Sequence, residues 1–235
     1  IDLRGRDPDD VFSDIPYEKG ALFLREVEQK VGRKQFDQFL TQYFNHFVFQ
    51  SITTEQFLAY FKQHLIAKYP QKLSLKRVKQ WLFEPGLPAG APVPHSDAFV
   101  IVDKARNGWL NGDIKLADID TKGWSVHQWL YFLNNMPDKL SNEQLQALDK
   151  QYDLTASHNN EIEHSWLMIA VKNQYQPAYN RLHDYLIHIG RNKLVKPLYQ
   201  QLAKTPQGKV FAEQPFQLAK PGYQPRTVKA AESVL

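Results

Sequence analysis

The chain has 235 residues, of which 43% are hydrophobic and 13% aromatic, so it can bury a large core. It has no cysteine, which excludes disulfides, thiolate zinc sites, iron–sulfur clusters and a cysteine nucleophile. The net charge of +4 is spread along the chain rather than gathered in one tract, so we expect neither nucleic acid nor membrane as a partner. No apolar run approaches the roughly 20 residues of a membrane span, so we expect a soluble protein. The composition leaves the compartment open, and we expect the cytoplasm.

Helical periodicity dominates the first third of the chain. Residues 17–31 are predicted to form a helix that ends at Gly32, because glycine suits the backbone after a helix. A third helix should follow Thr53, which forms a capping-box pattern with Gln56, and a short one should cover 78–83. Between them, residues 33–48 carry one apolar stripe at helical spacing that we expect to be buried: Phe36, Phe39, Leu40, Tyr43, Phe44 and Phe47.

The densest cluster of positive charge also has helical spacing. It consists of Lys72, Lys76, Arg77 and Lys79. We interpret it as a solvated helix face, since charge runs usually lie on exposed surfaces.

Residues 84–94 contain four prolines and two glycines, which forbid a continuous helix or strand. We interpret this segment as an interdomain linker. Residues 97–122 that follow are predicted to be irregular, and their Asn-Gly pairs at 107–108 and 111–112 could mark a β-hairpin.

From residue 125 onward the pattern predicts successive helices. Their expected starts are capping patterns that pair Ser125 with Gln128, Ser141 with Gln144 and Asn160 with Glu163. Four prolines should interrupt or begin these helices: Pro137, Pro177, Pro197 and Pro206. Such a series favours an armadillo-like helical superhelix, and an irregular helical bundle is the alternative.

No motif for a complete catalytic centre is present. No two of the eight histidines lie four residues apart, the spacing of a helical zinc-binding pair. Glu161 and His164 lie three residues apart and could share a metal. The alternative is that both only stabilise the start of a helix by their charge and packing. The chain also lacks a nucleophile elbow, a phosphate-binding glycine loop and a dinucleotide fingerprint. Two segments differ from scaffolding: the acidic loop and helix start at 5–20, and the basic turn at 190–193.

The first of these segments carries a resemblance to a known family. Its Asp-Pro-Asp and Pro-Tyr-Glu-Lys-Gly sequences resemble the stretch after the zinc-binding helix in the leukotriene A(4) hydrolase and aminopeptidase B family of zinc aminopeptidases. Further matches follow in the family's order at residues 51–54, 81–88, 159–162, 190–193 and 197–198.

The resemblance implies an all-α chain with two domains. Residues 1–84 would be the carboxy-terminal helices of a thermolysin-like catalytic domain, 85–96 a proline-rich linker, and 97–235 an armadillo-like superhelix. It also implies a zinc metallo-aminopeptidase that acts on short peptides, with all zinc ligands upstream of Ile1. These residues would then be inert without the upstream catalytic domain, their partner in the same polypeptide.

The resemblance also assigns roles to five residues. Tyr17 would be catalytic, because a protonated phenol can donate a hydrogen bond to the oxyanion that forms during hydrolysis. Asp9 and Phe12 would bind substrate, although the family's epoxide hydrolase has a tyrosine where this chain has Phe12. Arg191 and Lys193 would bind the free carboxylate of a peptide, a task that suits guanidinium geometry.

A non-catalytic reading stays open beside this one. A helical-repeat module could bind a partner peptide along a concave face and do no chemistry. A zinc motif, H-E-x-x-H, encoded upstream of Ile1 would favour the enzyme over the interaction module.

Overall fold

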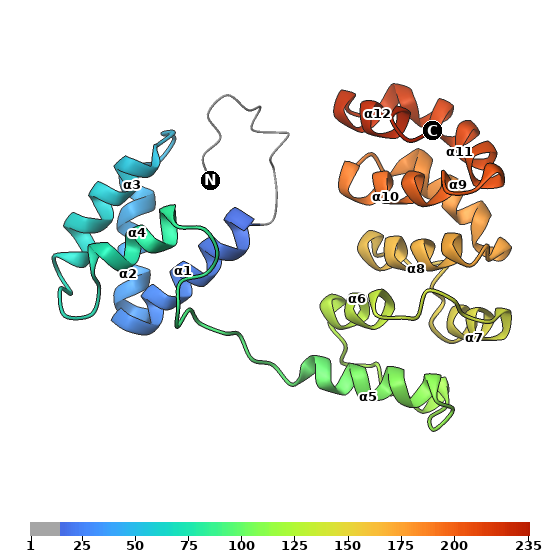
Figure 1. The fold of residues 1–235 in the computed structure, drawn as a ribbon, viewed down its shortest axis with the longest axis horizontal. Coiled ribbons are helices and arrows are strands. Elements are labelled where there is room, and N and C mark those ends of the chain that lie inside the picture. Colours follow the sequence, from blue (N-terminus) through green and yellow to red (C-terminus); the bar gives the residue numbers. More distant parts are fainter. Residues whose placement is uncertain (1–14) are drawn as a thin grey trace. The chain divides into compact units, whose positions relative to one another are not determined.

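The computed structural model describes residues 15–235, which fold entirely as helices and turns (Figure 1). The all-α class predicted from the sequence is therefore confirmed. The chain divides into two compact units, Ile1–His95 and Ser96–Leu235, and each has its own hydrophobic core. No helix between residues 15 and 235 is long and apolar enough to cross a lipid bilayer.

The described part of the first unit contains four α-helices. They are α1 (Ile15–Val31), α2 (Arg33–His46), α3 (Thr54–Phe61), which continues as the π-helical turn η2 (Lys62–Ile66), and α4 (Leu75–Phe83). Gly32 ends α1 with a φ of +92°, a backbone conformation that side chains disfavour. The Thr53–Gln56 capping box at the start of α3 is present, as predicted.

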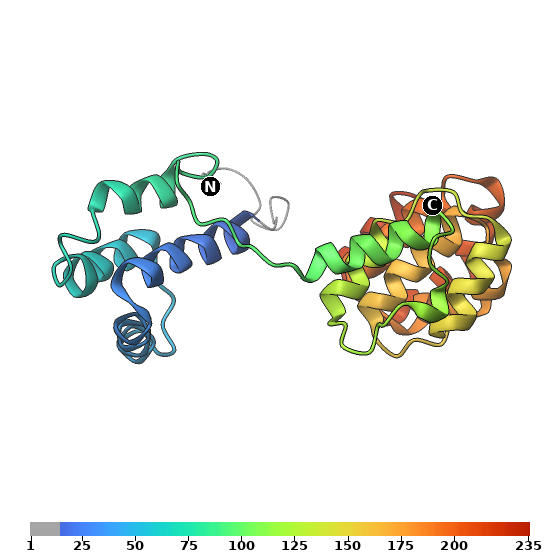
Figure 2. The same cartoon turned by 90° about the horizontal axis from the view of Figure 1, so that it is seen from below.

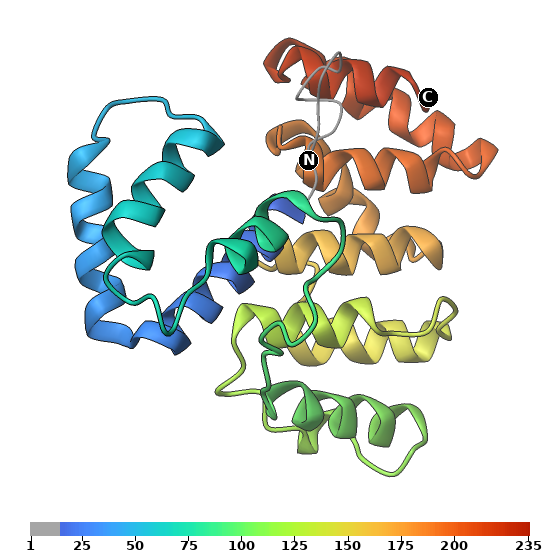
Figure 3. The same ribbon diagram turned by 60° about the vertical axis from the view of Figure 1, so that its left-hand side comes forward.

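Aromatic rings fill the core of this unit. Phe39 of α2 packs against Tyr60 and Phe61 of α3, and Phe23 of α1 contacts Trp81 of α4. The expected buried stripe on α2 is only partly correct, because Phe44 is 65% exposed. In Figure 3 α2 and α3 lie side by side, with α1 at one end of the pair.

The basic cluster near α4 is not simply a solvated face. Lys72 lies in the turn before the helix, and Arg77 points inward, where two of its nitrogens donate hydrogen bonds to Glu26 of α1 at 2.9 and 2.7 Å. Trp81 donates a third hydrogen bond to the same carboxylate at 2.9 Å. Burial alone would raise the pKa of Glu26, but these donors together with Lys30 lower it to about 2.

The second unit stacks its helices into a superhelix. In order they are α5 (Ala98–Leu110), η3 (Leu116–Asp118), α6 (Val126–Asn134), α7 (Asn142–Tyr152), α8 (Asn160–Lys172), η4 (Gln176–Ala178), α9 (Tyr179–His188), α10 (Asn192–Leu202), α11 (Pro206–Ala219), η5 (Lys220–Gly222) and α12 (Pro225–Glu232). Helices α6, α8, α10 and α12 pack one on the next in one row, and α9 packs on α11 in another (Figure 1). Viewed from below in Figure 2, the layers lie one behind another. The superhelix is confirmed over the irregular bundle.

Residues 97–122 are more regular than predicted. Ala98–Leu110 is a helix, and Asn107-Gly108 lies inside it rather than in a hairpin. Tertiary contacts override the low helix propensity of its β-branched residues: Val102 is fully buried, and Phe99 stacks on Tyr131 with 4.4 Å between ring centroids. The second pair, Asn111-Gly112, is the turn that ends the helix.

Two predicted helix boundaries in this unit are wrong. Pro197 lies inside α10 and does not interrupt it, whereas Pro206 begins α11 as expected. The capping pair of Asn160 and Glu163 is not formed. Instead Asn159 caps α8, and Glu163 is buried and paired with Arg181.

Candidate functional site

Tyr17 is the third residue of α1 and therefore lies in its first turn, as predicted. Its side chain is 60% exposed. The phenol is thus not part of the aromatic core of the first unit, which removes the simplest structural explanation for a tyrosine at a helix start.

The start of α1 is held by a contact with the end of α4. The ammonium group of Lys19 donates a hydrogen bond to the backbone carbonyl of Glu84, the residue that caps α4. Further along, the Glu26–Arg77 ion pair joins the same two helices. The first contact joins α1 to the end of α4 just after the turn that carries Tyr17, and the second joins the two helices farther along.

Two of the predicted substrate-binding residues, Asp9 and Phe12, lie outside the described residues. Their roles stay predictions.

Arg191 and Lys193 lie together in the second unit, at the start of α10. Arg191 is the residue before the helix and Lys193 is its second residue. Both cations are exposed, with 63% and 68% of their side chains accessible. Arg191, but not Lys193, lines an open groove of about 500 Å³, together with residues 158–161, 188–190 and Leu194. An open groove with a cation at its edge can accept an anionic group without disturbing the core.

The structure also brings Glu161 to this groove, a contact that the sequence did not predict. Arg191 Nη1 donates a hydrogen bond to Glu161 Oε1 at 3.0 Å, and Lys193 Nζ lies 3.7 Å from Oε2. Glu161 is the second residue of α8, so its charge also favours the positive end of that helix. The sequence signal was the motif at 159–162, which matched the family without a role for the glutamate.

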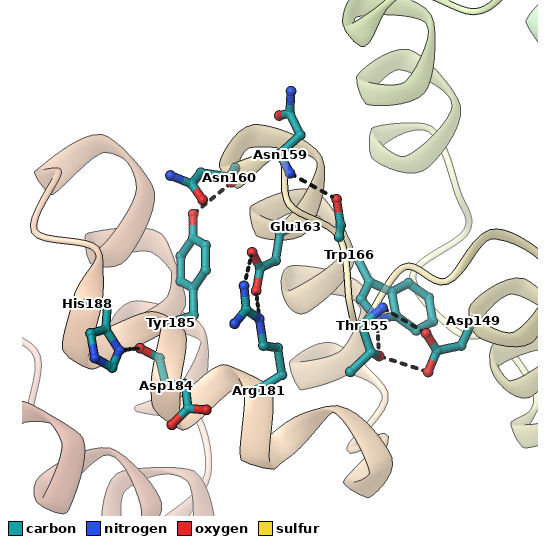
Figure 4. Close-up of polar contacts among 11 residues, drawn as sticks. Asp149, Thr155, Asn159, Asn160, Glu163, Trp166, Arg181, Asp184, Tyr185 and His188 are labelled. Carbon is teal, nitrogen blue, oxygen red and sulfur yellow. Dashed lines mark hydrogen bonds and ion pairs between the residues drawn. The ribbon is translucent and has the colours of Figure 1, made fainter.

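Hydrogen bonds and an ion pair fix the start of α8 beneath this cluster (Figure 4). The side chain of Asn159 accepts hydrogen bonds from the backbone N–H groups of Glu161 and Ile162 at 3.1 and 3.2 Å. The hydroxyl of Tyr185 in α9 donates to the carbonyl of Asn160 at 2.8 Å. One turn further, Glu163 is fully buried and accepts two hydrogen bonds from Arg181 of α9. The start of α8, which carries Glu161, is therefore capped and joined to α9.

The negative charge of the buried Glu163 carboxylate is balanced by the positive charge of Arg181. Burial raises the pKa of its carboxyl, and the Arg181 guanidinium opposes that rise. Arg181 is 38% exposed, so it joins a buried carboxylate to solvent at the edge of α9.

A second polar group supports α8 from the side of α7. Asp149 accepts hydrogen bonds from the backbone and the hydroxyl of Thr155, both at 2.8 Å, and the hydroxyl in turn accepts one from Trp166 at 2.9 Å (Figure 4). These contacts tie the loop before α8 to both neighbouring helices. The loop that leads to groove residues 158–161 is thus held in place by α7 and α8.

A metal centre is not formed by the part of the chain that the structure describes. Between residues 15 and 235, no three His, Asp or Glu side chains come close enough to bind a metal ion together. The Glu161–His164 pair considered from the sequence belongs to no such group, and Glu161 instead pairs with Arg191. The side chains of 15–235 therefore do not fit a zinc site.

Two family models match the chain. Residues 3–81 match "Peptidase family M1 domain", and residues 124–235 match "Leukotriene A4 hydrolase, C-terminal". The two matches fall in different compact units.

Curated proteins and a solved structure are similar over most of the chain. "Leucine aminopeptidase 2" of Pyricularia oryzae is 34% identical across 87% of this chain and 34% of its own length, and "Leukotriene A-4 hydrolase homolog" of Botryotinia fuckeliana is 30% identical across 86% and 32%. The structure of yeast LTA4 hydrolase in complex with Bestatin covers 97% of this chain and 40% of its own, with 27% identity and a TM-score of 0.76. The chain thus spans about a third of the length of the curated relatives.

Proposed function

Because the chain belongs to peptidase family M1 and carries the leukotriene A4 hydrolase C-terminal domain, we propose that it is part of a zinc aminopeptidase that removes amino-terminal residues from short peptides. Curated relatives named leucine aminopeptidase support this activity. The observation that carries the proposal is the exposed phenol of Tyr17 within the stretch that matches the peptidase domain.

In this proposal each unit has its own task. Residues 1–84 complete a catalytic domain, 85–96 link it to the superhelix, and 97–235 bind the far end of the peptide. The zinc ligands are proposed to lie outside this chain, as the family resemblance implies; the side chains of residues 15–235 form no metal site. Bound zinc would supply the activated water of a metallopeptidase.

Tyr17 has the role of an oxyanion donor. When water attacks the scissile carbonyl, negative charge develops on its oxygen, and a phenol held at a fixed point can donate a hydrogen bond to that charge. The first turn of α1 is held through Lys19 and Glu84, so the donor needs little reorganisation during the reaction. Removing such a donor typically costs about 2.7–4 kcal/mol of transition-state stabilisation.

Arg191 and Lys193 have the role of a carboxylate anchor. The exposure of both cations, and the place of Arg191 at an open groove, suit the free carboxylate of a short peptide, which Arg can bind with two parallel hydrogen bonds. Short peptides with a free carboxylate, of about tripeptide size, are the proposed substrates, and Asp9 and Phe12 are proposed to contact them.

The test of this function is metal dependence in the full-length protein that contains this chain. Hydrolysis of leucine p-nitroanilide should stop when the protein is dialysed against 1,10-phenanthroline and return when zinc is added. Hydrolysis that persists without metal would contradict a zinc aminopeptidase. Peptide binding with no hydrolysis under any condition would instead support the helical interaction module.

A further inference from the structure

The carboxylate of Glu161 occupies the two cations that are proposed to hold the substrate. Its Oε1 accepts a hydrogen bond from Arg191 at 3.0 Å, while its Oε2 lies 3.7 Å from the ammonium group of Lys193. Each oxygen therefore faces one cation. This is the arrangement that a peptide carboxylate would need in order to bind both cations at once.

Glu161 is held at this place by its backbone. It follows directly on Asn159 and Asn160, which are fixed by the α8 cap and by Tyr185 (Figure 4). The start of α8 cannot move relative to α9 without breaking the bond between Asn160 and Tyr185. Only the side chain of Glu161 can yield to another anion.

The cations leave room for a second carboxylate. Arg191 and Lys193 are each more than 60% exposed, and Glu161 is 32% exposed. A guanidinium has five N–H donors, and Arg191 donates only through Nη1 to Glu161. A substrate carboxylate can thus reach Arg191 from solvent, but it meets the like charge of Glu161 a few ångströms away.

We propose that Glu161 is a specificity-determining residue, whose carboxylate competes with the substrate carboxylate for Arg191 and Lys193. This inference rests on the proposed function of the two cations. The cluster has two positive charges and one negative charge, so it attracts anions with a single net positive charge. Glu161 therefore weakens the preference for peptides with a free carboxylate over peptides without one.

The test compares trialanine with trialanine amide as substrates of the full-length protein. Glu161→Gln keeps the shape of the side chain and removes its charge. KM for trialanine should fall about fivefold, the effect of roughly one unit-charge repulsion at 4 Å in water. KM for the amide and kcat for both substrates should stay unchanged, a split that a general structural defect would not produce.

Glu143→Gln is the matched control. Glu143 is the second residue of α7, as Glu161 is of α8, but it does not line the groove. Both variants lose a negative charge at a helix start, so the melting temperature should fall in both, and Glu161→Gln also loses its ion pairs with Arg191 and Lys193. Glu143→Gln should leave both KM values unchanged.

The remaining outcomes separate this inference from the proposed function. A higher or unchanged KM for trialanine in Glu161→Gln would contradict the proposal that Glu161 competes with the substrate carboxylate. If Glu161→Gln folds poorly, Glu161→Ala takes its place and should also lower KM for trialanine. Arg191→Ala tests the carboxylate anchor separately. If kcat/KM falls for trialanine but not for trialanine amide, the anchor is supported and only the role of Glu161 is in question. If kcat/KM falls equally for both substrates, the proposed anchor is contradicted.

Discussion

Arg191 and Glu161 are 30 positions apart in the sequence, yet the Nη1 of one lies 3.0 Å from the Oε1 of the other. Their ion pair joins the start of α10 to the start of α8, because the two helices are neighbours in one row of the superhelix. The carboxylate of Glu161 thus meets the cations of Arg191 and Lys193, and Glu161 and Arg191 line one groove.

Arg191→Ala should selectively weaken peptides that end in a free carboxylate. A hydrogen bond to a charged group contributes about 1.5–3 kcal/mol, so kcat/KM for trialanine should fall about 10- to 100-fold and that for trialanine amide should not change. Lys196→Ala is the control, since Lys196 lies on the same helix but does not line the groove. Equal losses on the two substrates in Arg191→Ala would contradict the anchor.

The sequence could identify the residues of this cluster but not their contact. The motif at 190–193 marked Arg191 and Lys193 because charged residues in a turn are free to point at a ligand. Glu161 was assigned to a helix start, which is correct, but helical periodicity cannot show which other helix start lies beside it. Which helix starts lie side by side depends on how successive helices of the superhelix rotate and pack against one another, and this is set by tertiary structure rather than by local sequence.

The fold was predictable where a local signal agreed with the tertiary structure. The box of Thr53 with Gln56 is such a case, because its two hydrogen bonds form within four residues. The local sequence did not predict α5, because this helix depends on the packing of Phe99 and Val102 against other helices. It also did not predict the pairing of Glu163, because its partner Arg181 lies 18 residues later in the chain. Pro197 was misjudged because a helix held by neighbours on both sides tolerates one missing hydrogen bond.

Acid should destabilise the first unit through Glu26. Its carboxylate is almost fully buried, and its pKa is lowered to about 2 from an ordinary value of 4.5. A lowered pKa stabilises the folded state above about pH 4.5, and this contribution is lost as the pH falls toward 2. Urea unfolding between pH 7 and 2.5 should therefore show a flatter pH dependence in Glu26→Gln than in the wild type. An identical slope in both proteins would count against the ion pair.

Arg181→Met should destabilise the second unit strongly. The substitution leaves the fully buried carboxylate of Glu163 without its cation. Breaking a buried pair in this way lowers the free energy of unfolding by about 3–5 kcal/mol. Adding Glu163→Leu should restore most of the lost stability, since the two apolar side chains leave no buried charge. The free energy of urea unfolding measures both steps. A double variant that is as unstable as Arg181→Met would show that the charge is not the cause.

Phe49→Asn should stabilise the first unit. Phe49 has a φ of +56° and a fully exposed ring, so it bears backbone strain without burying its side chain. Asparagine tolerates this conformation, and the melting temperature should rise by the equivalent of about 1 kcal/mol. Phe44→Asn is the control, because Phe44 is also exposed but lies in the regular helix α2, where asparagine is a poorer helix former. Equal decreases in melting temperature for both variants would rule out strain at Phe49.

Tyr17→Phe is the variant that tests the catalytic proposal most directly. In the full-length protein, kcat for leucine p-nitroanilide should fall about 10²- to 10³-fold, because the transition state loses a preorganised donor. KM and the melting temperature should change little, since the ring of Tyr17 is exposed and the phenylalanine keeps its shape. Tyr69→Phe in the same unit should leave kcat unchanged. Turnover of Tyr17→Phe close to that of the wild type would contradict the assignment of this phenol to the oxyanion.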